Sequence, residues 1–159
     1  MADAENVRAR EKEPPPLSNY EMAIRRHREI AERNRTGRVV CKLDEVPQEI
    51  TRQGRLRTYL GLNVKDTPLQ DWIVFTHEIR TASGKHKHQG GLIIYVIEGK
   101  GYSVVDGERI DWAPDTLFVT PPGAVHSHHN RGDKMMLSYV VQDTGVHSQL
   151  RTTNFAWTE

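Results

Sequence analysis

Apolar residues recur along the chain with two different spacings. Between about Asn19 and Arg33 the spacing is helical, and one face carries Tyr20, Ala23, Ile24, His27, Ile30 and Ala31. Ser18 followed by Glu21 has the spacing of a capping box, which starts a helix. Gly37 is a residue type that ends one. The pattern therefore predicts one amphipathic helix near the N-terminus.

Beyond Gly37 the rhythm changes to short apolar runs separated by turn residues. The runs are Val39 to Leu43, Leu56 to Leu60, Trp72 to Ile79, Leu92 to Ile97, Tyr102 to Val105, Leu117 to Thr120, Val125 to His128 and Met136 to Val141. Runs of this length and spacing are typical of an all-β sandwich or barrel. Asp106 and Gly107 lie between two strand-like segments, and both tolerate the positive φ of a type I′ turn, so a hairpin is predicted there.

The N-terminal segment differs in composition from the rest of the chain. Its first seventeen residues are charged and include Pro14, Pro15 and Pro16, which cannot continue a helix. We expect an arm and helix over residues 1–37 and a single β domain over residues 38–159. Because an isolated amphipathic helix is marginal in water, it should pack on the barrel or on a second subunit, which favours a homodimer or higher homo-oligomer.

Charge and composition narrow the function classes. The 159 residues carry 22 basic and 21 acidic side chains, so no global charge attracts nucleic acid or a membrane surface. Cys41 is the single cysteine, which excludes an internal disulfide. No apolar run approaches the roughly 18 residues of a membrane helix, and the first residues lack the apolar core of a signal peptide. We expect a soluble, cytoplasmic protein whose partners are small molecules.

Histidines are concentrated in one part of the sequence. Five of the eight fall between Lys85 and Asn130, namely His86, His88, His126, His128 and His129. Residues two apart on a strand share a face, so His86 and His88 can present both imidazoles to one metal ion. An isolated pair of this kind is more often a surface feature. His126 follows the turn Pro121-Pro122-Gly123 and can supply the third nitrogen from a second strand.

Two longer segments resemble a known family. Gly84 to Gly99, GKHKHQGGLIIYVIEG, is similar to the first cupin motif, and Pro121 to Asn130, PPGAVHSHHN, is similar to the second. The two motifs occur in the right order and separation, within roughly residues 70–142. The resemblance implies a cupin fold, a double-stranded β-helix or jelly-roll-like barrel, with a divalent metal on His86, His88 and His126.

One position departs from the usual cupin pattern. The slot of the common glutamate ligand holds Leu92, which leaves a three-histidine site. This arrangement resembles the gentisate, salicylate and hydroxynaphthoate ring-cleaving dioxygenases, whose second motif also contains H-x-H, here His126-Ser127-His128. Those enzymes are two-cupin chains, and they tend to place an arginine where this chain has Ile94.

The donor set suggests the chemistry. Three neutral imidazoles leave a divalent metal with its full charge, which favours an anionic chelating substrate. The resemblance implies Fe(II), O2 and oxidative cleavage of a C–C bond in an aromatic or enolisable compound. The same nitrogens accept Zn, Ni or Mn, so a non-redox cyclase or isomerase and a non-catalytic binding protein remain alternatives. His128 is either a catalytic acid/base or oxygen-stabilising group, or a structural hydrogen-bonded histidine.

Other side chains are weaker candidates. His77 and Glu78 are adjacent on a predicted strand, so only one of them can face inward. Glu98 precedes a turn and should be solvated, and His129 should point away from the site. The alternating residues Leu92, Ile94 and Val96 should form an apolar wall inside the barrel.

Overall fold

The computed structural model describes residues 16–143, 146–147, 150 and 155–159, and the chain in them is mostly β. The elements in order are α2 (Asn19–Thr36), a short 3-10 helix (Leu43–Glu45), β1 (Glu49–Thr51), β2 (Gly54–Leu60), β3 (Ile73–Ile79), β4 (His86–His88), β5 (Leu92–Glu98), β6 (Gly101–Val105), β7 (Glu108–Trp112), β8 (Leu117–Thr120), β9 (His126–Asn130), β10 (Met136–Gln142) and β11 (Phe155–Trp157). The all-β expectation is confirmed. None of the helices in these residues has the length and apolar character that a membrane crossing requires.

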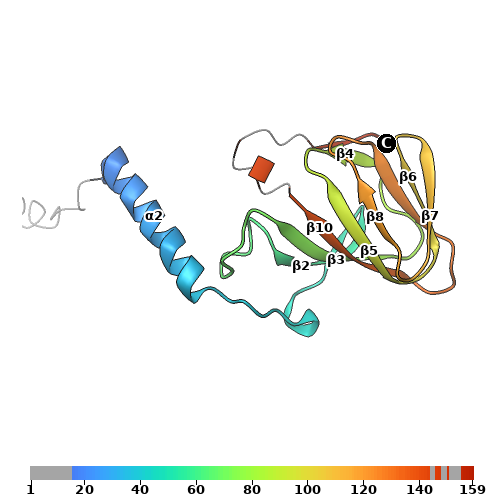
Figure 1. The fold of residues 1–159 in the computed structure, drawn as a ribbon, viewed down its shortest axis with the longest axis horizontal. Helices are drawn as coiled ribbons and strands as arrows, with labels where there is room; N and C mark the ends of the chain where they lie inside the picture. The colour runs from blue at the N-terminus through green and yellow to red at the C-terminus, as the bar shows by residue number, and fades with distance from the viewer. Residues whose placement is uncertain (1–15, 144–145, 148–149, 151–154) are drawn as a thin grey trace, which may run out of the picture.

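The strands form two antiparallel sheets that face each other (Figure 1). One sheet has the order β1-β2-β3-β10-β5-β8 and the other β11-β4-β9-β6-β7. Along β5 the alternation is the predicted one, since Leu92, Ile94 and Val96 are buried and the residues between them are exposed. The inward side chains of both sheets meet in one apolar core of Phe75, Ile79, Leu92, Ile94, Val96, Trp112, Phe118, Met136 and Val140.

The hairpin predicted at Asp106-Gly107 joins β6 to β7. Asp106 has a φ of 48° and Gly107 a φ of 89°, as a type I′ turn requires. Val105 and Glu108 are directly paired, which leaves a two-residue loop. The turn sequence therefore determined the register of this pair.

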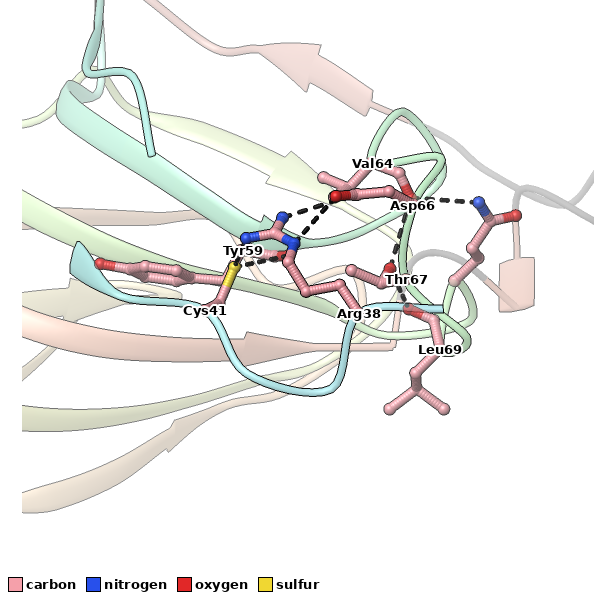
Figure 2. Close-up of polar contacts among 8 residues, drawn as sticks. Arg38, Cys41, Tyr59, Val64, Asp66, Thr67 and Leu69 are labelled. Atoms are coloured by element: carbon pink, nitrogen blue, oxygen red, sulfur yellow. Dashed lines mark hydrogen bonds and ion pairs between the residues drawn. The ribbon is translucent and has the colours of Figure 1, made fainter. Parts of the chain in front are cut away.

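The apolar run from Val39 to Leu43 is not a strand, contrary to the prediction. The chain there is irregular and then forms the 3-10 helix, and Val39 and Val40 are 85% and 68% exposed. Contacts of Arg38 hold this segment in place (Figure 2). Its Nε donates to the carboxylate of Asp66 at 2.8 Å, and its guanidinium also contacts Cys41. None of the strands in the described residues pairs with the run, so its β propensity has no ladder to join.

Helix α2 begins at the predicted capping box and extends three residues beyond the predicted end at Arg33. Gly37 has a φ of −63°, so it does not adopt the left-handed conformation. A Cβ at Gly37 would lie 2.6 Å from the carbonyl oxygen of Arg33 and 2.9 Å from Pro68, so close packing explains the glycine. The helix extends away from the barrel (Figure 1), and none of its residues is buried.

Candidate metal centre

Two strands of the smaller sheet bring three histidines together. His86 and His88 are the two inward positions of β4, and His126 is paired directly with His86 as the first residue of β9. One ring nitrogen from each histidine lies within 4.8 Å of those of the other two. The turn at Gly123 joins the two sequence motifs, since its N–H donates to the carbonyl of His88 at 2.8 Å. The predicted trio is therefore adjacent in the fold.

Backbone carbonyls orient the three rings. Nδ1 of His86 lies 3.0 Å from the carbonyl oxygen of Gly84, and Nδ1 of His126 lies 2.9 Å from that of Ala124. Nδ1 of His88 lies 3.1 Å from the carbonyl oxygen of Gly90 and 3.0 Å from the amide nitrogen of Gln142. A carbonyl only accepts, so Nδ1 of His86 and Nδ1 of His126 carry the proton, and Nε2 of each of these two rings keeps a lone pair.

These lone pairs fit a metal ion. Nε2 of His126 is buried and has no hydrogen-bond partner among the residues that the structure describes, a costly arrangement unless another group fills the position. Ligating histidines commonly donate their other N–H to a carbonyl, as His86 and His126 do here. The donor set of three imidazoles suits Fe, Zn, Ni or Mn.

Burial keeps the rings neutral at neutral pH. It lowers the pKa of His126 to about 4 and also lowers the pKa of His86 and of His88, mainly because the charged form loses its hydration. A neutral imidazole is the metal-binding form, so little competition from protons is expected at pH 7.

A cavity of about 190 Å³ opens beside the three histidines. Its apolar lining consists of Ile73, Phe75, Leu92, Ile94, Val140 and Phe155. Leu92, which stands where most cupins have a glutamate ligand, is 4% exposed. Among the described residues, the polar lining is made of neutral amides and imidazoles.

His77 and His128 are the other imidazoles of this cavity. His77 is the inward member of its pair, whereas Glu78 faces Gln48 on the opposite side of β3. His128 follows His126 by two residues, so the two rings share a face, with centroids 5.6 Å apart. Burial lowers the pKa of His77 to about 4 and holds that of His128 well below its usual value.

Two residues predicted to lie outside the site do so. His129 stacks on Tyr102 with ring centroids 4.7 Å apart and takes a contact from Ser127. Glu98 pairs with Lys134 at 2.7 Å on the exposed surface. Neither lines the cavity.

Sequence reasoning missed three residues that border the site. Gln53, in the turn between β1 and β2, places Nε2 3.3 Å from Nε2 of His86. Gln142, the last residue of β10, places its amide nitrogen 3.0 Å from Nδ1 and 3.4 Å from Nε2 of His88. Phe155 on β11 is stacked on His88 at an interplanar angle of 11°. Because inward and outward residues alternate along β10, the sequence offered a signal for Gln142. No local pattern identified Gln53 or Phe155.

Comparisons with known proteins agree with this architecture. The family model described as cupin domain matches residues 74–142. A 5-nitrosalicylic acid 1,2-dioxygenase from Bradyrhizobium sp is 29% identical over 66 residues, which are 42% of this chain and 32% of that protein. A gentisate 1,2-dioxygenase from Streptomyces sp is 34% identical over 58 residues, 36% of this chain and 16% of that one. The chain thus spans a third or less of the curated relatives it matches.

Solved structures share the fold. A salicylate 1,2-dioxygenase from Pseudoaminobacter salicylatoxidans, crystallised as an adduct with gentisate, superposes with a TM-score of 0.61 at 16% identity, covering 84% of this chain and 35% of that one. The polyketide cyclase RemF from Streptomyces resistomycificus superposes with a TM-score of 0.55 at 19% identity, covering 66% of this chain and 78% of that one. The expected fold is confirmed.

Proposed function

Since the chain carries a cupin domain and has the cupin fold, we propose that it is a metal-dependent dioxygenase that cleaves a C–C bond in a small chelating substrate. The substrate is aromatic or enolisable. His86, His88 and His126 hold Fe(II), and the substrate occupies the adjoining cavity. The curated relatives, which act on nitrosalicylate and gentisate, support this class.

The convergence of three neutral imidazoles, with Leu92 in place of a carboxylate, carries the proposal. A two-histidine, one-carboxylate site would lower the charge of a divalent metal by one, and this site does not. A substrate with adjacent ionisable oxygens supplies the missing negative charge. When bound, Fe(II) supplies redox chemistry with O2.

The chain's own residues prepare the cavity for such a substrate. Leu92, Ile94 and Phe155 present apolar surface that excludes water and suits a ring or alkyl body. Gln53 and Gln142 place amide groups beside the proposed ligands, where they can hydrogen-bond substrate oxygens. We assign His128 as the hydrogen-bonding group that acts on the substrate.

A non-redox function is the second candidate. The same three nitrogens bind Zn(II), Ni(II) or Mn(II), which act as Lewis acids on an enolisable substrate. The polyketide cyclase RemF shares the fold over 66% of this chain, and this likeness concerns the fold alone. A third possibility is a cupin that binds its ligand without turnover.

Oxygen uptake distinguishes these functions. The metal-free protein is reconstituted anaerobically with Fe(II) and then given hydroxybenzoates, catechols, hydroquinones and β-diketones in an oxygen electrode. Fe(II)-dependent uptake, with labelled oxygen in the product, supports the dioxygenase. Conversion by Zn(II)-loaded protein without oxygen uptake supports the cyclase or isomerase, and tight binding without conversion supports the binding protein. His86→Ala is the matched metal-site control.

We also propose that the protein is a homodimer or higher homo-oligomer in which residues 1–37 form an assembly arm on the domain of residues 38–159. The outer face of β5, β8 and β10 is apolar and exposed, with Ile93, Tyr95, Ile97, Leu117, Val119 and Tyr139 between 37% and 60% exposed. Water-facing sheet surfaces are usually polar, so this face supports contact with a second copy. Helix α2, with no buried residue, supports the same assembly.

A further inference from the structure

His128 is held by a hydrogen-bonded chain that lies outside the cavity. Its Nδ1 is 2.7 Å from the hydroxyl oxygen of Ser103, which lies directly opposite it in the β6–β9 pair. The indole Nε1 of Trp112, on β7, is 3.0 Å from the same oxygen. Ser103 is fully buried, and Trp112 and His128 are 4% and 2% exposed. Three adjacent strands thus contribute one residue each.

The direction of these hydrogen bonds follows from the chemistry of the groups. An indole N–H only donates, so the hydroxyl oxygen of Ser103 accepts from Trp112. If Nδ1 of His128 also donated to this oxygen, the hydroxyl proton of Ser103 would be buried without an acceptor, which is costly. The hydroxyl therefore donates to Nδ1 of His128. In the neutral ring the single proton must then reside on Nε2.

This tautomer is the reverse of that of the neighbouring histidine. His126 faces the carbonyl of Ala124, so its Nδ1 is protonated and its Nε2 offers a lone pair. His128 faces a hydroxyl that donates, so its Nε2 is a hydrogen-bond donor on the ring edge away from Ser103. Histidines two residues apart on one strand thus become a metal ligand and a donor, and the partner atom decides which.

We propose that Ser103 and Trp112 are positioning residues that keep His128 as an Nε2–H donor to an anionic substrate oxygen in the cavity. The donor role rests on the proposed function, because it requires a substrate beside the three histidines. The tautomer of His128 does not rest on the proposed function, because it follows from contacts between buried residues of the protein. The hydrogen bonds from Trp112 to Ser103 and from Ser103 to His128 also explain why His128 is not a metal ligand, since a protonated Nε2 has no lone pair to give.

Long-range proton–nitrogen correlation NMR of the full-length protein loaded with diamagnetic Zn(II) tests the tautomer directly. The parent protein should show His128 protonated at Nε2, and Ser103→Ala and Trp112→Phe should each move the ring toward the Nδ1–H form. The matched control is Ser127→Ala, a buried serine on the same strand whose hydroxyl contacts His129 instead. A proton on Nδ1 of His128 in the parent protein overturns the proposal, even if Ser103→Ala and Trp112→Phe both fail to fold.

Binding of nitrocatechol to the same Zn(II)-loaded proteins tests the donor role without turnover. Ser103→Ala should weaken nitrocatechol binding by about tenfold while Zn(II) affinity stays unchanged, because one hydrogen bond to a charged oxygen is lost. Equal binding to parent and variant, or equal losses of nitrocatechol and zinc binding, would leave the pair with a structural role only. If the oxygen electrode detects no dioxygenase activity, the proposed function fails, but the NMR and nitrocatechol measurements still test this inference.

Discussion

Replacing Leu92 with glutamate tests the three-histidine reading of the site most directly. Leu92 is 4% exposed and lines the cavity with the proposed ligands. It is paired with Thr120 on β8 and with Gln142 on β10, so a carboxylate there would have two polar neighbours on the same face. The buried hydroxyl of Thr120 has no hydrogen-bond partner within the described part of the chain and can donate to this carboxylate.

The magnitude has two opposing parts. Without metal, the variant loses the burial of a leucine side chain, about 2 kcal/mol, and buries a carboxyl group at a cost of about 1 to 3 kcal/mol. We therefore expect the metal-free form to be less stable by roughly 3 to 5 kcal/mol, within the stability of an ordinary domain. With metal, the ionised carboxylate adds a ligand and lowers the charge of the site by one. Metal affinity should rise at least about tenfold, or 1.4 kcal/mol.

The assay compares Leu92→Glu with Leu92→Gln, which loses the same apolar surface without adding charge. Urea unfolding measures stability with and without Zn(II), and competition with a chromophoric chelator measures affinity. Only the glutamate variant should bind Zn(II) more tightly than the parent, and nitrocatechol should bind it more weakly. If folded Leu92→Glu and Leu92→Gln bind Zn(II) equally, position 92 does not occupy the missing ligand's place.

Three further predictions concern the histidines and the arm. Alanine at His86, His88 or His126 should remove most bound metal in elemental analysis, and full retention in all three variants would contradict the site. The pKa of His77 is about 4 when folded against 6.5 unfolded, so the unfolded chain binds the proton at higher pH, and metal-free stability should fall by up to about 3 kcal/mol between pH 6.5 and 4. His77→Gln should flatten that loss in urea titrations, whereas an unchanged slope would exclude His77 as a source. Deleting residues 1–37 should lower the mass seen by light scattering, and unchanged mass and stability would rule out an assembly role.

Local patterns were sufficient wherever neighbours in sequence determine the structure. The capping box at Ser18 starts α2, and Asp106-Gly107 turns the β6–β7 hairpin, because both depend on contacts within a few residues. The same local pattern gave a wrong prediction for Val39 to Leu43, whose apolar run suits a strand but pairs with none of the described strands. A strand exists only where another lies beside it, and that information is not local.

The residues of the site also differ in whether local sequence could predict them. Its ligand candidates were readable because the period of a strand places His86 and His88 on one face, and the two motifs carry a family resemblance. Gln53 and Phe155 were not readable, because a turn and a short distant strand reach the cavity only through long-range pairing.

The sequence by itself determined which residue types and spacings are available, namely an all-β chain with three clustered imidazoles and no carboxylate at position 92. Only the tertiary structure decided which partner each imidazole meets. His126 and His128 are chemically identical side chains on one strand, and the roles that we propose for them differ because one Nδ1 meets a carbonyl and the other a serine hydroxyl. A hydrogen bond's direction depends on the partner atom, and folding alone brings that partner into place.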